Sequence, residues 1–156
     1  MMTALLNMGV SLNTASASEH IPEIEQQPRV LKEQARACHH SLPFKIFPKL
    51  TITEMIYNCV LWIIAFPQKG GVSASISPRT LVTGVKFDYN CQCKIAFGAY
   101  TQVHKENLPT NSQQVRTLGA ICLGSSGNLQ GGYKFMNLQT GKKLTHLRWT
   151  ALPIPQ

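Results

Sequence analysis

Apolar residues between positions 19 and 40 recur at steps of three, four or seven along the chain. Residues with this spacing lie on one face of a helix, so the pattern predicts an amphipathic helix over this segment. Its apolar positions are Ile21, Ile24, Leu31, Ala35 and Cys38.

Basic residues of the same segment, Arg29, Lys32 and Arg36, fall together on another face of that helix. A charged helix face is usually only solvated, and the alternative is a surface that contacts nucleic acid. Pro22 suits a first helical turn, whereas Pro28 lies in the interior, lacks an amide donor and clashes with the preceding turn at a cost of roughly 3 kcal/mol. We therefore expect the helix to kink or restart at Pro28.

A second apolar run, MIYNCVLWIIAF, follows Thr51 and Glu54 and ends before Pro67. Threonine with glutamate three residues later is typical of a capping box, which predicts a helix over 51–66. Its 16 or so residues fall short of the roughly 20 needed to span a bilayer, so we expect a buried helix and no membrane. If its cover is incomplete, the helix would drive self-association. The side chains concerned are Met55, Leu61, Trp62 and Ile63.

Helical spacing gives way to alternation in the second half of the chain. Ser77, Pro78 and Gly84 are typical of the cap, first turn and stop of one short helix. From Lys94 on, apolar residues alternate, and glycine-rich segments such as GSSGNLQGG suit tight turns. The pattern predicts strands over 94–103, 117–124, 133–138 and 142–149, which form a small antiparallel barrel with Phe97 and Phe135 in its core.

Positive charge is concentrated in the same half of the chain. Residues 1–84 carry seven Lys or Arg against five acids, and residues 85–156 carry eight against two, for a formal net charge of +8. Such an excess favours polyanions, because neutralising phosphates supplies most non-specific affinity for nucleic acid. The expected contacts on the barrel are Lys134, Lys142, Lys143 and Arg148, beside the stripe of Arg29, Lys32 and Arg36.

The cysteines and the short motifs exclude several classes of site. Five cysteines without regular spacing argue against a secreted disulfide framework, so we expect reduced thiols. Cys91 and Cys93 with His39 and His40 lack the spacing of a zinc finger, so no metal is expected. The chain also lacks a nucleophile constellation, a Walker-type phosphate loop and a dinucleotide fingerprint, and no small-molecule substrate is expected.

Several separated blocks resemble one family in order and spacing. They are GVSLNTASASEHIPEIE, ITEMIYNCVLWIIAFPQKGGVSASISPRTLVTG, FGAYTQVH, GAICLGSSGNLQGGYKFMNLQTGKKL and WTALPIP. Together they resemble the integrase region of copia-type LTR retrotransposon Pol polyproteins. The resemblance implies an α+β chain: a helical remnant of a ribonuclease-H-like integrase core over 1–84, a linker over 85–93, a Src-homology-3-like barrel over 94–152 and a tail over 153–156.

The resemblance also assigns a role to Glu25. It matches the third acidic position of the D, D, E metal site, in a helix that follows a short strand near Val10 to Leu12. In the family, three carboxylates hold two Mg²⁺ ions that activate the attacking oxygen and stabilise the leaving one. The two aspartates are expected upstream of Met1, and Asp88 is the only Asp of this chain. Gln26, where the family usually has a basic residue, is a further departure.

These observations predict a fragment of a retrotransposon integrase that is not an enzyme as an isolated chain, holds no cofactor and binds DNA weakly without sequence preference. Two alternatives stay open. One is a host-recruited interaction module that uses the apolar helix 51–66, and the other is a relic without function. Nothing in the sequence addresses the chain to a compartment, and a nuclear location follows only if the parental role persists.

Overall fold

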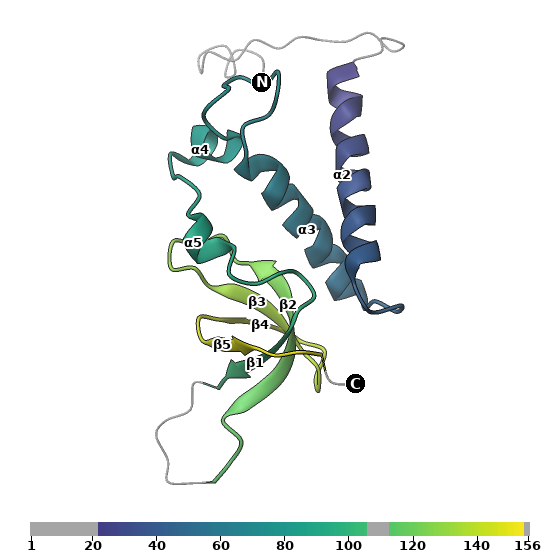
Figure 1. The fold of residues 1–156 in the computed structure, drawn as a ribbon, viewed down its shortest axis with the longest axis vertical. Coiled ribbons are helices and arrows are strands. Elements are labelled where there is room, and N and C mark those ends of the chain that lie inside the picture. The colour runs from purple at the N-terminus through teal and green to yellow at the C-terminus, as the bar shows by residue number, and fades with distance from the viewer. Residues whose placement is uncertain (1–21, 106–112, 155–156) are drawn as a thin grey trace, which may run out of the picture.

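Four helices are followed by a five-stranded antiparallel sheet in the computed structural model, which describes residues 22–105 and 113–154 (Figure 1). The α+β prediction is confirmed, while the strand expected near Val10 to Leu12 lies outside the described residues. The helices are α2 Pro22–Ser41, α3 Lys49–Ala65, α4 Pro78–Thr83 and α5 Tyr89–Gln92. The strands are β1 Tyr100–His104, β2 Thr117–Ser125, β3 Tyr133–Asn137, β4 Lys143–His146 and β5 Trp149–Ala151.

Helix α2 runs without a break through Pro28. The expected restart at this proline is therefore wrong, and Glu25 belongs to the same helix instead of a separate turn. The physical reason is that α2 packs along α3, and this contact favours a continuous helix over the local preference of one residue. Pro22 stands at the first helical position, as expected.

Helix α3 lies between α2 and the sheet (Figure 1). It begins at Lys49 after Pro48, with no side-chain cap, so the capping box of Thr51 and Glu54 does not form. Both residues lie inside the helix and are buried, and the Thr51 hydroxyl donates to the sulfur of Met136 on the sheet at 3.4 Å. Met55 is buried as well, so this side chain does not lack cover as the sequence suggested.

Helix α4 has the predicted ends. The Ser77 hydroxyl accepts from the backbone N–H of Thr80, Pro78 occupies the first turn, and Gly84 ends the helix with φ 70°. Helix α5 is one turn long and is capped by Asp88, whose Oδ1 accepts from the backbone N–H groups of Asn90 and Cys91. Both ends of α4 and the start of α5 follow from local chemistry alone.

The strands lie in the order β4-β3-β2-β1-β5, with all neighbours antiparallel. The segment 142–149, expected as one strand, is divided: β4 pairs with β3 and β5 pairs with β1, so they form the two edges of the sheet. The register of β2 and β3 shifts between Cys122 and Ser125, where Gly124 adopts φ 97°. Such a bulge bends a strand and increases its twist.

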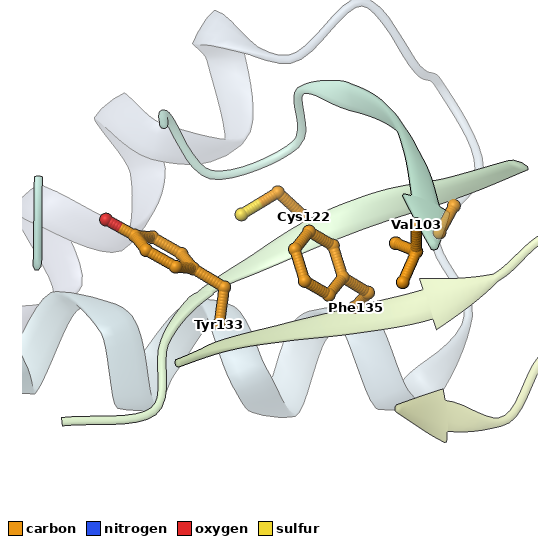
Figure 2. Close-up of a cluster of buried hydrophobic side chains, with 5 residues drawn as sticks. Val103, Cys122, Tyr133 and Phe135 are labelled. Atoms are coloured by element: carbon orange, nitrogen blue, oxygen red, sulfur yellow. The ribbon is translucent and has the colours of Figure 1, made fainter. Parts of the chain in front are cut away.

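The central strand β2 is buried on both faces, which makes two hydrophobic clusters. One cluster joins Val103, Ala120, Cys122, Tyr133 and Phe135, all nearly inaccessible to solvent (Figure 2). The other joins Ile121, Leu123 and Met136 with Leu50 of α3. Alternate residues of one strand point to opposite faces, so α3 covers one face and the segment around Ile95 and Ala99 contacts the other.

Phe135 is a core residue as predicted, whereas Phe97 is half-buried and packs in the cluster on the α3 side. The strand expected from Lys94 begins only at Tyr100. A turn at Gly98, with φ 81° and the Ala99 N–H donating to the Ala96 carbonyl at 3.3 Å, interrupts the alternation. Phe97 therefore packs on the face opposite to Val103, whereas Ile95 packs against the cluster that contains Val103.

Candidate nucleic-acid interface

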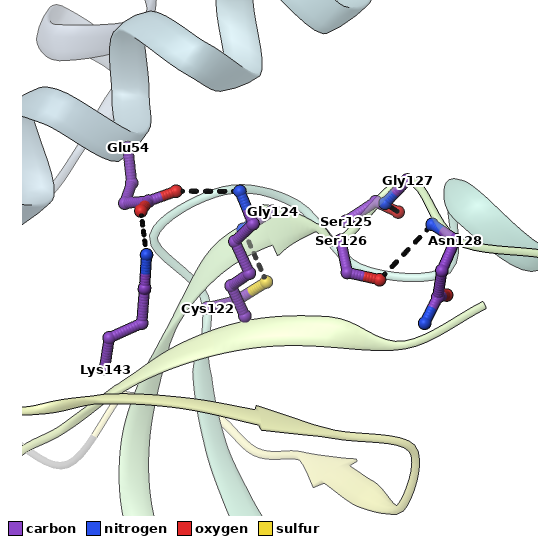
Figure 3. Close-up of polar contacts among 9 residues, drawn as sticks. Glu54, Cys122, Gly124, Ser125, Ser126, Gly127, Asn128 and Lys143 are labelled. Atoms are coloured by element: carbon purple, nitrogen blue, oxygen red, sulfur yellow. Dashed lines mark hydrogen bonds and ion pairs between the residues drawn. The ribbon is translucent and has the colours of Figure 1, made fainter. Parts of the chain in front are cut away.

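A buried carboxylate joins α3 to the basic strands. The side chain of Glu54 is 4% exposed, and its two oxygens accept from Lys134 Nζ at 3.0 Å and from Lys143 Nζ at 2.8 Å. Figure 3 shows Glu54 of α3 directed towards Lys143 of the sheet. Residues 94–156 contain one acidic residue, Glu106, so the helix supplies a counter-charge that the sheet sequence lacks.

The ionisation of Glu54 reflects this pairing. Burial alone would raise the pKa of its carboxyl, but hydrogen bonds from Lys143 and Lys134 outweigh that effect and hold the pKa below its ordinary value of 4.5. The hydrogen bond between Lys143 and Glu54 also raises the pKa of Lys143. Two of the four expected nucleic-acid contacts on the sheet are therefore engaged within the protein. The sequence signal of this role is an isolated glutamate in an apolar helix, but its spacing from Thr51 favours a capping box instead.

The other two expected contacts on the sheet are exposed. Lys142 precedes β4, and Arg148 lies between β4 and β5. Neither side chain makes an ion pair with any residue that the structure describes. Their charges are available to phosphate groups without the loss of an internal contact.

The basic stripe of α2 lies on a different element from the sheet. Arg29, Lys32 and Arg36 are exposed. Arg29 forms an ion pair with Glu33 one helical turn further on, with Arg29 Nε 3.1 Å from Glu33 Oε1. The Arg29 side chain is 80% exposed, so the pair contributes at most about 1 kcal/mol. Helix α2 contacts α3, so the stripe and the sheet lysines belong to separate parts of the fold. Glu25 is exposed on the same helix.

A groove beside β5 gathers basic and aromatic residues from four segments of the chain. Its volume is about 470 Å³, and Lys94, His104, Arg148 and Trp149 line it with Tyr133, Gly131 and Leu147. We call it the Trp149 groove. The Tyr133 hydroxyl accepts from the Lys94 backbone N–H at 2.8 Å and donates to the Cys91 carbonyl at 3.0 Å, and these bonds fix one wall. Neither Lys94 nor His104 is among the contacts expected from the sequence.

Electrostatics in the Trp149 groove favour an anion. None of its lining residues is acidic. Asp88 interacts with Lys94 electrostatically, but its Oδ1 accepts from two backbone N–H groups at the start of α5. Cations beside a partly exposed indole are the combination that contacts phosphate and stacks on a base.

The described residues offer no metal site. They contain no group of three or more His, Cys, Asp or Glu side chains that could hold an ion. Cys91 and Cys93 are free thiols, and Glu25 lies on a helix that carries no aspartate. None of the helices in the described ranges is long and apolar enough to cross a membrane.

Comparison of the chain with protein-family models, with curated proteins and with solved structures found no match. The likeness to copia-type polyproteins therefore stays a prediction from the sequence blocks.

Proposed function

We propose that this chain is a catalytically inactive fragment of a copia-type integrase region that binds nucleic acid weakly and without sequence preference. The observation that carries the binding proposal is the Trp149 groove, which places Lys94, His104 and Arg148 around an indole with no acidic residue in its lining. Exposed Lys142 adds a further cation. The cations of this surface contact phosphate groups of single or double strands, and the indole can stack on an exposed base of a single strand. The surface presents no array of side chains for reading base edges.

The sheet topology supports the finer part of the fold proposal. We take the five strands as a Src-homology-3-like barrel, because an antiparallel meander whose first strand also pairs with its last is compatible with a small, strongly curved sheet. The preceding helices would then be the remnant of a ribonuclease-H-like core. A solved structure in which β4 and β5 lie on a flat sheet would contradict this proposal.

Salt dependence tests the binding proposal. With fluorescence anisotropy and duplex DNA, three phosphate contacts predict a log–log slope of about −2.7 against salt concentration. Lys94→Gln with Arg148→Gln should weaken binding to every sequence and reduce the slope by about 2. The charge-matched control is Lys45→Gln with Lys69→Gln, since both lysines are exposed and lie outside the sheet. Equal losses in the two double variants, or binding that ignores salt, would refute the proposal.

Absence of catalysis is tested separately. We expect no strand transfer or cleavage with Mg²⁺ or Mn²⁺, because Glu25 alone cannot bridge two metal ions. Metal-dependent activity that Glu25→Gln abolishes would contradict this part of the proposal and leave the binding part intact.

The competing interaction-module proposal has weaker support. Met55 and Cys59 of α3 are buried, and the helix has the sheet on one side and α2 on another. Ile52, Tyr57 and Phe66 remain exposed at its rim. Association that depends on these side chains and not on salt would favour this alternative.

A further inference from the structure

A second groove lies on the α3 side of the sheet, away from the Trp149 groove. Its volume is about 350 Å³, and α3, α4, the end of β2 and the loop that follows β2 enclose it. We call it the α3–loop groove. Val60, Leu61, Ile64 and Leu123 contribute its apolar lining, and its polar side chains include Arg79 and Lys134. The volume suits one small ligand unit, since such sites measure roughly 300–1,000 Å³.

The loop that forms one wall is fixed before any ligand arrives. The Ser125 hydroxyl donates to Gln92 Oε1 at 2.6 Å, and the Gly127 N–H donates to the same hydroxyl at 3.0 Å. Gln92 Nε2 donates to the Asn128 carbonyl at 2.7 Å, so α5 holds both ends of the turn. Figure 3 shows Ser125, Ser126, Gly127 and Asn128 gathered in this turn. A preorganised wall lowers the entropy lost on binding.

Arg79 supplies a cation at this wall. Its Nη2 donates to the Gly127 carbonyl at 2.6 Å, and its guanidinium carbon lies 5.4 Å from the centre of the Phe87 ring. Its Nε is buried and has no hydrogen-bond partner among the described residues. No described carboxylate forms an ion pair with Arg79. The guanidinium is therefore held in place while its charge is not neutralised.

Lys134 and Tyr57 complete the groove. Lys134 Nζ uses one of its three donors on Glu54 and lies 5.9 Å from the centre of the Tyr57 ring. The Tyr57 side chain is exposed, with 62% of the residue surface accessible. Both oxygens of Glu54 accept from lysines, so Arg79, Lys134 and Lys143 outnumber the one carboxylate in this region. The groove thus combines an apolar lining, an accessible aromatic ring and excess positive charge.

We propose that the α3–loop groove binds one nucleotide of a single-stranded nucleic acid, with the base against Tyr57 and the apolar lining and the phosphate between Arg79 and Lys134. This inference rests on the proposed nucleic-acid binding and assigns it a strand preference. A duplex buries its base faces in its own stack and cannot insert one into so small a groove without unpairing it. A single strand offers both the base face and the phosphate at no such cost.

Tyr57 is the position at which to test the inference, because its exposure means that truncation leaves the core intact. We expect Tyr57→Ala to weaken binding of a short oligothymidylate by roughly tenfold, Tyr57→Phe to retain it, and neither to change binding of a duplex of equal length. Ile52→Ala is the matched control, since Ile52 is an exposed apolar residue of α3 that does not line the groove. Arg79→Gln should also weaken oligothymidylate binding, and circular dichroism checks that each variant is folded.

The outcomes separate the two proposals. Oligothymidylate binding that Tyr57→Ala leaves unchanged, while duplex binding persists, overturns the α3–loop groove and leaves the proposed function standing. Thymidine monophosphate that binds as tightly as the oligonucleotide overturns the strand proposal, since the site would then take a free nucleotide. Failure of the unmodified protein to bind either nucleic acid overturns both proposals.

Discussion

Glu54→Gln should destabilise the protein far more than the same substitution at Glu33. The Glu54 side chain is 4% exposed and accepts from two ammonium groups, whereas the Glu33 side chain is 58% exposed and pairs within one helix. The substitution keeps the shape of the side chain and removes its charge, so two lysines lose their counter-ion. Both variants change the net charge equally, which makes Glu33→Gln the matched control.

The expected magnitude follows from the exposure of the partners. A hydrogen bond to a charged group contributes about 1.5–3 kcal/mol, and loss of one member of a fully buried pair costs about 3–5 kcal/mol. Lys134 and Lys143 have side chains that are 26% and 47% exposed, so both ammonium groups regain water when the carboxylate is lost. We therefore expect a loss of about 2 kcal/mol for Glu54→Gln and less than about 0.5 kcal/mol for Glu33→Gln.

Urea denaturation followed by far-ultraviolet circular dichroism measures both values, and thermal unfolding should show a fall in Tm of about 4–8 °C for Glu54→Gln. The pKa of Glu54 is lowered in the folded protein, so its contribution is present above the ordinary pKa and is lost as the pH falls through the folded-state pKa. The difference between the unmodified protein and Glu54→Gln should thus shrink below pH 4.5. Equal stability losses at Glu54 and Glu33 near neutral pH would refute the reasoning.

Three further outcomes are expected. Gly124→Ala should lower the unfolding free energy by about 1–3 kcal/mol, because φ is 97° and a Cβ there would lie 2.5 Å from Asn58 Oδ1. Adding Asn58→Ala should recover only the stability lost to this steric clash. Full recovery in urea denaturation would contradict a cost from the backbone conformation. Pro28→Ala should raise the unfolding free energy by about 1–3 kcal/mol, since α2 continues through this residue; circular dichroism showing a less stable helix would count against it. Hydrogen exchange should be slowest in β2 and β3, with the Phe135 amide better protected than those of α2, and the reverse order would exclude the sheet as the stable centre.

Local chemistry explains which elements could be predicted from the sequence. Ser77, Pro78 and Gly84 delimit α4 because each acts on backbone groups within one turn, so no distant contact is needed to place them. The end of α3 before Pro67 has a similar local cause. The glycine-rich segments also predict tight turns from local chemistry, and Gly127, Gly131 and Gly141 have the positive φ that such turns use.

Distant contacts explain what could not be predicted. Thr51 and Glu54 have the spacing of a capping box, but their side chains contact residues of the sheet 80 or more positions away. Nothing near Glu54 in the sequence identifies Lys134 and Lys143 as its partners. The division of the segment 142–149 into β4 and β5 likewise depends on which edge of the sheet each half pairs with, a choice that alternation alone does not contain.

The candidate site was predicted unevenly for the same reason. Composition indicates where positive charge is abundant, and Lys142 and Arg148 are indeed exposed. Composition does not show which cations are neutralised inside the fold, so Lys143 could not be told apart from its neighbour Lys142. The grooves form between segments far apart in the sequence. The sequence around Arg79 does not indicate its place in the groove, because that place depends on the loop that contains Gly127.

Strand β1 pairs with β5, which the ribosome makes last. When the ribosome has made His104, the edge of β1 that will bind Thr150 and its neighbours still has no partner, and 44 residues lie between His104 and Trp149. At about 5–20 residues per second, that edge waits for roughly 2–9 s of translation, plus the time that β5 needs to leave the exit tunnel. An unpaired strand edge attracts other chains. Slow codons between β1 and β5 should therefore increase aggregation of the nascent protein, whereas slow codons before β1 should not, because the edge does not yet exist when they are translated.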